Sequence, residues 1–249
     1  MRFLILSDIH GNIDALDAVL DRNPRDSYDR LLILGNLVGY GAAPNEVVDR
    51  IFDLKPDVVV RGHHDKVSAG VEELETSRRV SGEAARWTHS TLTPDNLERV
   101  AELPAGPKNV DRDVEVCHGT PLDENTSVLD EGDAAGALDA SNRKICFFGH
   151  THVPVAYIRR GSKLTVTRPQ PGGPDTTVIH VDKTRRYLIN PGSVGQPRDT
   201  DARSSYATYD SKRLRIEIRR IPYRIDLAQQ RITEAGLPES LAFRLGLGR

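Results

Sequence analysis

The chain has 249 residues, which is long enough to bury a core and fits one large α/β domain or two small ones. Its formal net charge of −2 gives no basic footprint for nucleic acid, and no apolar segment approaches the roughly 20 residues that span a bilayer. The two cysteines, Cys117 and Cys146, make no disulfide framework and no secretory signal opens the chain, so a cytoplasmic protein is expected.

An apolar run near the start of the chain breaks abruptly into polar residues. Residues 3–6 are all apolar, which is typical of a parallel strand covered on both faces. Asp8 and His10 follow this strand, in the crevice where open α/β sheets bind ligands. A carboxylate and an imidazole placed there are candidate metal ligands. The competing interpretation is a polar turn in which Asp8 serves as a helix cap.

Strand and helix patterns alternate along the first 150 residues, as they do around a parallel sheet. Further strands are expected at 30–34, 57–60, 114–117 and 144–148. Helices are expected after the predicted N-cap Asn12, over 44–54, within a helical insert at about 66–107, and within 122–143.

Short β-patterns dominate the chain from about residue 155. They lie at 155–159, 163–168, 176–181, 186–189, 204–209 and 213–219. We interpret the break near 155 as a change of sheet. We do not interpret it as a domain boundary, because the loop at 190–195 resembles the earlier strand-end loops. Residues 1–249 are therefore predicted to form a single domain that ends in helices over about 225–249.

A basic strip lies in the C-terminal part of the chain. It consists of Arg213, Arg215, Arg219, Arg220 and Arg224, interleaved with apolar residues. We interpret the strip as the solvated face of a strand in preference to a phosphate-binding patch.

Histidines gather at the predicted strand ends. Six of the eight lie there: His10, His63, His64, His118, His150 and His152. In a parallel sheet these ends converge on one crevice, where imidazoles without a cation would repel one another when protonated. Imidazole and carboxylate ligands together suit Mn, Fe, Ni, Zn or Co better than Ca, so the pattern predicts a transition-metal site.

Five motifs in order resemble those of the calcineurin-like metallophosphoesterase superfamily, and its small prokaryotic phosphodiesterases most of all. They are Asp8-x-His10, Gly35-Asn36-x-x-Gly39, Gly62-His63-His64-Asp65, His118-Gly119-Thr120-Pro121 and Gly149-His150-Thr151-His152-Val153-Pro154. The resemblance runs from residue 3 to about 198. It implies an α/β fold, a four-layer αββα sandwich of two mixed β-sheets flanked by helices, with two divalent metal ions at the strand ends.

The resemblance also implies a role for each motif residue. Asp8, His10 and His152 would hold the first metal, position 36 would bridge both metals, and His63, His118 and His150 would hold the second. His64 would polarise the phosphoester or protonate the leaving oxygen.

The function implied is that of a metal-dependent hydrolase acting on a small phosphodiester or nucleotide-type phosphoester, with manganese among the candidate metals. A hydroxide generated between two metals would attack phosphorus in line. Diadenosine polyphosphates are one candidate substrate class. No membrane or nucleic-acid partner is expected, and a homodimer is left open. The alternative function is a catalytically impaired scaffold or binding protein with the same fold.

Two residues depart from the pattern that the resemblance implies. Asn36 stands where the family has Asp, and His63 stands where it has Asn. A neutral amide brings no bridging charge, and two dications about 4 Å apart repel by roughly 17 kcal/mol at an effective dielectric of about 20. We therefore expect a weakened second metal, partly compensated by His63. The sequence leaves open a natural two-metal variant, a natural one-metal variant and an engineered inactivation.

Residues that would bind substrate are less marked in the sequence. Asn12 is a candidate donor to a phosphate oxygen, with helix capping as the equal alternative. Arg198 is a candidate phosphate clamp, with a salt bridge to Asp199 or Asp201 as the equal alternative. Tyr40 is expected to pack in the core more than to stack on a base.

Overall fold

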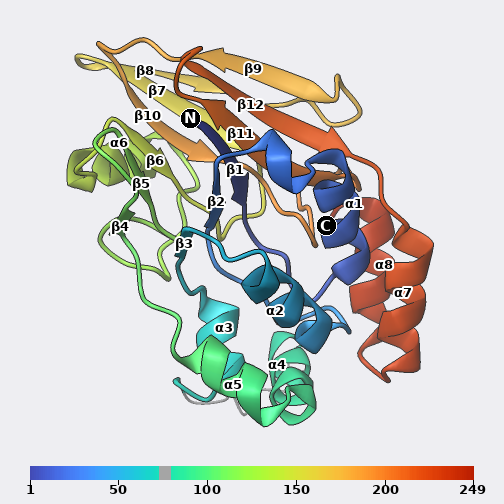
Figure 1. Ribbon diagram of the computed structural model, residues 1–249. Helices are drawn as coiled ribbons and strands as arrows, with labels where there is room; N and C mark the ends of the chain where they lie inside the picture. Colours follow the sequence, from blue (N-terminus) through green and yellow to red (C-terminus); the bar gives the residue numbers. More distant parts are fainter. Residues whose placement is uncertain (73–79) are drawn as a thin grey trace.

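Two six-stranded sheets form the centre of the computed structural model, which describes residues 1–72 and 80–249 (Figure 1). The strands of the first sheet are β1 (Arg2–Leu6), β2 (Arg30–Ile33), β3 (Val58–Val59), β9 (Thr176–His180), β11 (Ser204–Asp210) and β12 (Arg215–Ile221). Their order is β3-β2-β1-β11-β12-β9. The first three strands run parallel, and β11 joins β1 in antiparallel pairing.

The second sheet is mixed in the same way. Its strands are β4 (Lys108–Asn109), β5 (Val114–Val116), β6 (Ile145–Phe147), β7 (Val155–Arg160), β8 (Lys163–Thr167) and β10 (Arg186–Asn190). They lie in the order β4-β5-β6-β10-β7-β8, with β5, β6 and β10 parallel. Since β6 and β7 belong to this one sheet, the predicted change of sheet near residue 155 is wrong.

Eight helices and a 3₁₀ turn (Arg25–Ser27) complete the described part of the chain. The helices are α1 (Ile13–Arg22), α2 (Pro44–Asp53), α3 (His63–Ser68), α4 (Val80–Thr91), α5 (Pro94–Ala101), α6 (Glu131–Ala140), α7 (Ile225–Glu234) and α8 (Glu239–Leu247). Residues 73–79 of the predicted helical insert lie outside the described residues. Among the described helices, none has the length and apolar character required to cross a membrane.

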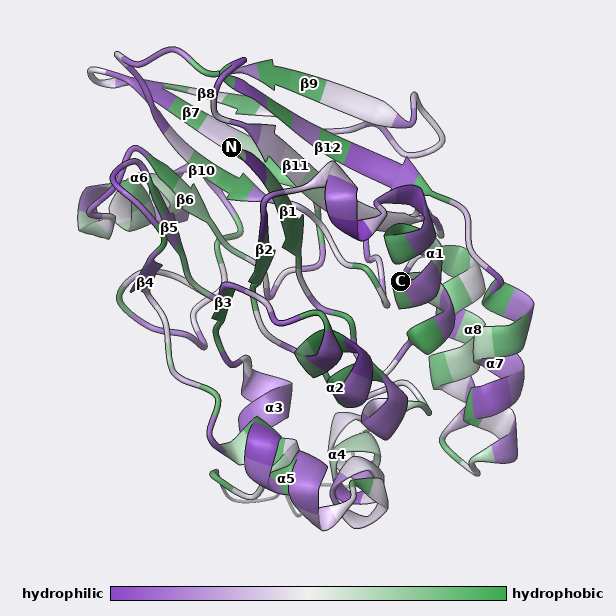
Figure 2. Ribbon diagram, in the orientation of Figure 1, coloured by the Kyte–Doolittle hydropathy of each residue, from purple (hydrophilic) through white to green (hydrophobic). Residues whose placement is uncertain are grey.

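Three separate apolar cores define the four layers. Leu4 and Leu6 point from β1 toward α1 and α2, whereas Phe3 and Ile5 point from the same strand toward the second sheet. A third core lies between the second sheet and α6, around Leu138. The layers are therefore helices, sheet, sheet and helix, as predicted, and Figure 2 shows the apolar residues of β1 and β2 at the centre. Both faces of β1 are buried, which explains why its sequence shows no polar alternation.

The basic strip is only partly a solvated face. Along β12 the buried positions are Ile216, Ile218 and Arg220, so Arg220 shares the inner face with two isoleucines. Its side chain is 2% exposed, and its guanidinium forms an ion pair with Asp199 that compensates the buried charge. The prediction of a solvated side chain is wrong for Arg220, because its position in the strand alternation carries more weight than its charge.

The two sheets each contribute three parallel strands whose carboxyl ends face the same region. Loops from the first sheet follow β1, β2 and β3, and loops from the second follow β5, β6 and β10. Backbone bonds join the two sets: Val194 N–H donates to Ser7 O at 2.9 Å and Gly195 N–H to Asp8 O at 3.0 Å. The crevice expected at one parallel sheet is therefore built by two sheets.

Candidate metal centre

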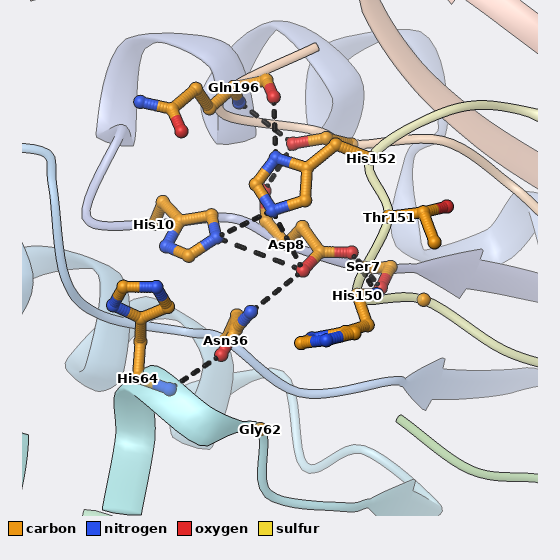
Figure 3. Close-up of polar contacts among 12 residues, drawn as sticks. Ser7, Asp8, His10, Asn36, Gly62, His64, His150, Thr151, His152 and Gln196 are labelled. Carbon is orange, nitrogen blue, oxygen red and sulfur yellow. Dashed lines mark hydrogen bonds and ion pairs between the residues drawn. The ribbon is translucent and has the colours of Figure 1, made fainter. Parts of the chain in front are cut away.

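Three predicted ligands from both sheets converge on one point (Figure 3). Asp8 and His10 lie in the loop after β1, and His152 lies in the loop after β6. Asp8 Oδ1 is 3.7 Å from His10 Nε2 and 3.4 Å from His152 Nε2. The two imidazole Nε2 atoms are 3.1 Å apart. The ligand atoms of Asp8, His10 and His152 all lie within 4.8 Å of one another. No other group of three histidines, cysteines or acidic residues in the described part of the chain has its ligand atoms this close together.

The other nitrogen of each imidazole is fixed by a backbone carbonyl. His10 Nδ1 lies 3.1 Å from Val38 O, and His152 Nδ1 lies 2.6 Å from Gln196 O. Because a carbonyl oxygen only accepts, each Nδ1 carries the hydrogen and each Nε2 presents a lone pair to the pocket. Two facing lone pairs at 3.1 Å repel unless a cation lies between them. The donor set therefore fits a divalent transition metal.

Burial controls the protonation of this pocket. It lowers the pKa of both His10 and His152 well below the usual value, so both rings are neutral ligands at pH 7. Burial raises the pKa of Asp8, and this effect outweighs the hydrogen bonds from Ser7 and Asn36, which lower it. A cation in the pocket would favour the carboxylate form and so couple metal binding to proton release.

A second group of imidazoles lies beside the first. His118 Nδ1 donates to Leu34 O at 2.7 Å, which turns its Nε2 toward His150 Nδ1 at 3.3 Å. Burial lowers the pKa of each of these two histidines to about 4. His63 Nδ1 is buried and has no hydrogen-bond partner, so a third imidazole nitrogen in this region is free to bind a ligand.

Asn36 lies between the two groups, and its amide is fully used. Nδ2 donates to Asp8 Oδ1 at 2.9 Å, and Oδ1 accepts the His64 backbone N–H at 3.0 Å (Figure 3). The backbone donor fixes which end of the amide is oxygen. The amide thus directs hydrogens toward the carboxylate oxygen that faces His10 and His152, where a bridging carboxylate would direct lone pairs.

His63 and His64 open helix α3, whereas the sequence placed them at the end of a strand. The His64 ring lies 5.0 Å from the His10 ring and 4.3 Å from the Tyr40 ring, measured between centroids. Burial, followed by the charge of His63, lowers the pKa of His64 well below its usual value. Tyr40 is buried, as expected, and its ring is 4.8 Å from that of His10.

Sequence reasoning assigned no role to Asp65, which organises the loop of Asn36. This buried carboxylate accepts four backbone N–H groups, from Asn36 (2.7 Å), Leu37 (2.8 Å), Val38 (3.2 Å) and Gly62 (2.9 Å). Burial raises its pKa to about 6, although the four hydrogen bonds lower it. The acidic residue at the third position of a helix that follows glycine is the signal that could have found it.

Most of the predicted metal ligands have a left-handed backbone. Of the seven predicted ligands, the five with φ between 51° and 68° are Asp8, His10, Asn36, His150 and His152. This conformation costs on the order of 1 kcal/mol for a residue other than glycine, and Asp, Asn and His adopt it more readily than most. The strain is therefore concentrated at the centre, where the loop hydrogen bonds sustain it.

The two substrate-binding candidates have different surroundings. Asn12 caps α1 by accepting from Ala15 N–H at 3.1 Å and donates to Gly195 O at 2.9 Å, so both ends of its amide are engaged. Arg198 donates to Gln196 Oε1 at 2.9 Å. The alternative role of Arg198 was a salt bridge to Asp199 or Asp201. Instead, Asp199 forms an ion pair with Arg220, and Asp201 forms ion pairs with other arginines.

Comparison with known proteins identifies the family. The model of the calcineurin-like phosphoesterase superfamily domain matches residues 1–213. An uncharacterised protein of Methanocaldococcus jannaschii is 35% identical over 98% of this chain and 97% of its own length. The crystal structure of a metallophosphoesterase from Sphaerobacter thermophilus is 38% identical, with a TM-score of 0.87 over 100% of this chain and 99% of that one. A hypothetical protein from Pyrococcus horikoshii shares the fold at 19% identity, with a TM-score of 0.79 over 100% of this chain and 98% of that one.

The chain belongs to the calcineurin-like phosphoesterase superfamily. It is a metallophosphoesterase, a hydrolase that acts on phosphoester bonds, and the family implies divalent metal cofactors. The resemblance drawn from the five motifs and the four-layer fold that it implied are both confirmed.

Proposed function

We propose that the chain hydrolyses a small phosphodiester or nucleotide-type phosphoester at the centre formed by Asp8, His10 and His152. The observation that carries the proposal is the convergence of two imidazole Nε2 atoms on one carboxylate oxygen, at 3.4 and 3.7 Å. When bound, a divalent cation lowers the pKa of water and neutralises charge on the phosphate oxygens. The chain's own residues hold and orient that cation; manganese remains our candidate among Mn, Fe, Ni, Zn and Co.

We assign the second, weaker metal position to His63, His118 and His150. Support comes from the inward Nε2 of His118 and the partnerless Nδ1 of His63. Asn36 adds no negative charge, and its amide is hydrogen-bonded to Asp8 and to the His64 backbone N–H. It therefore lowers the metal affinity of this position.

His64 is assigned to the leaving group. Its ring borders His10 and is neutral in the free protein, because burial lowers its pKa. A bound phosphate anion would raise that pKa and favour proton donation.

The assignment is tested with His64→Gln on two diesters at saturating Mn²⁺. We expect kcat to fall about 100-fold or more on diphenyl phosphate and clearly less on bis-p-nitrophenyl phosphate, whose leaving group needs less help from an acid. Metal content should not change. Equal losses on both diesters would contradict the role of His64, and no turnover of either diester by the wild type would contradict the proposed function.

The alternative function, an impaired scaffold or binding protein, is favoured by one observation. The Asn36 amide donates to Asp8 Oδ1, the oxygen that faces both imidazoles of the first position. If this contact prevents productive metal binding, the wild type will show no diesterase activity with Mn²⁺ and Asn36→Asp will restore it.

Location and assembly remain part of the proposal. Cys117 Sγ and Cys146 Sγ lie 3.7 Å apart as free thiols, which supports a reducing cytoplasm. We propose one domain over residues 1–249, supported by the pairing of the N-terminal strand β1 with the late strand β11 in the first sheet. The homodimer stays a prediction.

A further inference from the structure

Two arginines from distant parts of the chain share one aromatic ring beside the metal centre. The guanidinium carbon of Arg198 lies 5.5 Å from the centroid of Tyr40, and that of Arg244 lies 5.7 Å from it. The Tyr40 ring in turn lies 4.8 Å from the ring of His10. The ring therefore places two positive charges next to the candidate ligands.

Among the described residues, no aspartate or glutamate side chain forms an ion pair with either guanidinium. Arg198 Nε is buried with no hydrogen-bond partner, and the Nε of Arg244 donates to Arg249 O at 3.1 Å. Burial, followed by the positive charge of Arg198, lowers the pKa of Arg244. Two half-buried cations that repel each other gain stability from an anion between them.

The backbone fixes both arginines relative to the metal centre. The backbone N–H of Arg198 donates to His152 O at 3.4 Å. Arg198 also lies two residues after Gln196, whose carbonyl orients the His152 ring. Arg244 lies on α8 (Figure 1), and the carbonyl of Gly248, which caps this helix, accepts the Thr200 N–H at 2.9 Å. The loop of Arg198 is thus tied to the helix of Arg244.

We infer that Arg198, Tyr40 and Arg244 form a subsite for a second phosphoryl group, adjacent to the phosphorus that is hydrolysed. Arg198, next to His152, contacts the phosphate at the metals, and Arg244 contacts the next phosphate along. The substrate class is then a phosphoester with a diphosphate unit, as in nucleoside di- and polyphosphates. This inference rests on the proposed function for the position of the first phosphate. Arg244 lies beyond residues 1–213, the range that the family model matches.

The test compares the binding of pyrophosphate and orthophosphate by calorimetry, at one fixed concentration of free Mn²⁺. We expect the wild type to bind pyrophosphate at least tenfold more tightly than orthophosphate. Arg244→Gln should reduce this preference to less than threefold, and Arg244→Lys should retain part of it. Arg224→Gln is the matched control, because Arg224 is exposed and pairs with Asp226 away from the ring.

The subsite is contradicted if the wild type binds both anions equally, or if Arg244→Gln keeps the wild-type preference while its circular dichroism is native. A purely structural stacking role for Arg244 would lower stability without changing the ratio of the two affinities. Turnover does not enter the measurement, so an inactive protein that prefers pyrophosphate would contradict the proposed function and leave the subsite intact.

Discussion

Asn36 determines the charge available between the two candidate metal positions. Its Nδ2 bonds to Asp8 Oδ1, and its Oδ1 is occupied by a backbone N–H. The side chain therefore stabilises the metal-free centre by satisfying a buried carboxylate. Because both ends of the amide are engaged, Asn36 offers no free ligand atom to the proposed second position.

Asn36→Asp should convert this residue into a bridging ligand. Coulomb attraction to two cations is large in a buried pocket, so we expect the second Mn²⁺ to bind at least tenfold more tightly and kcat on bis-p-nitrophenyl phosphate to rise. Metal analysis and steady-state kinetics check both. Asn109→Asp, which adds the same charge on the exposed strand β4, is the control. Unchanged metal content and turnover would contradict the role given to Asn36.

The buried histidines should make the metal-free protein sensitive to acid. His118 and His150 have folded pKa values of about 4, below the usual 6.5, so the unfolded chain binds more protons between these limits. Stability from these groups is present above about pH 6.5 and is lost as the pH falls toward 4, by about 1.4 kcal/mol per pH unit for each group. Asp65, with a pKa raised to about 6, acts in the opposite direction.

His118→Asn isolates this contribution, because the Asn amide can replace the bond to Leu34 O. Urea unfolding of chelator-treated protein from pH 4 to 7 should show a shallower pH dependence than in the wild type. His180→Asn, at an exposed position of β9, should follow the wild type. Parallel curves for His118→Asn and the wild type would contradict the assigned burial effect.

At the scale of elements, the loop after β2 is held by helix α3. Asp65 accepts N–H groups from both segments, and its carboxylate has enough lone pairs for all four. An amide at this position would direct its own hydrogens against some of those donors.

Asp65→Asn should therefore destabilise the protein by about 2 kcal/mol or more, because buried donors lose their acceptor. The loop of Asn36 should move as well, which we expect to lower Mn²⁺ affinity. Urea unfolding and metal titration measure the two effects. Asp95→Asn, in the exposed first turn of α5, should change stability by only a few tenths of a kcal/mol. Wild-type stability in Asp65→Asn would show that the four bonds are dispensable.

At the scale of the molecule, local patterns in the sequence predicted the strand ends and the residues that meet there. Phe3 to Leu6 revealed a strand buried on both faces, and the polar residues after it revealed the crevice. Arg220 and Asp65 could not be placed, because their burial depends on partners that are remote in the sequence or belong to the backbone. The meeting of Arg244 with Tyr40 depends on how α8 docks, which no local pattern encodes.

The central claim is that Asp8 and imidazoles from two sheets hold a divalent cation, and metal-linked stability tests it most directly. Chelator-treated wild type should bind at least one Mn²⁺ per chain in calorimetry. Ion at 100 times the Kd should add about 2.7 kcal/mol of stability, which raises Tm by roughly 5–10 °C. Asp8→Asn, which keeps the left-handed backbone accessible, should lose both effects. Identical Mn²⁺ binding and identical Tm shifts in the wild type and Asp8→Asn would contradict the claim.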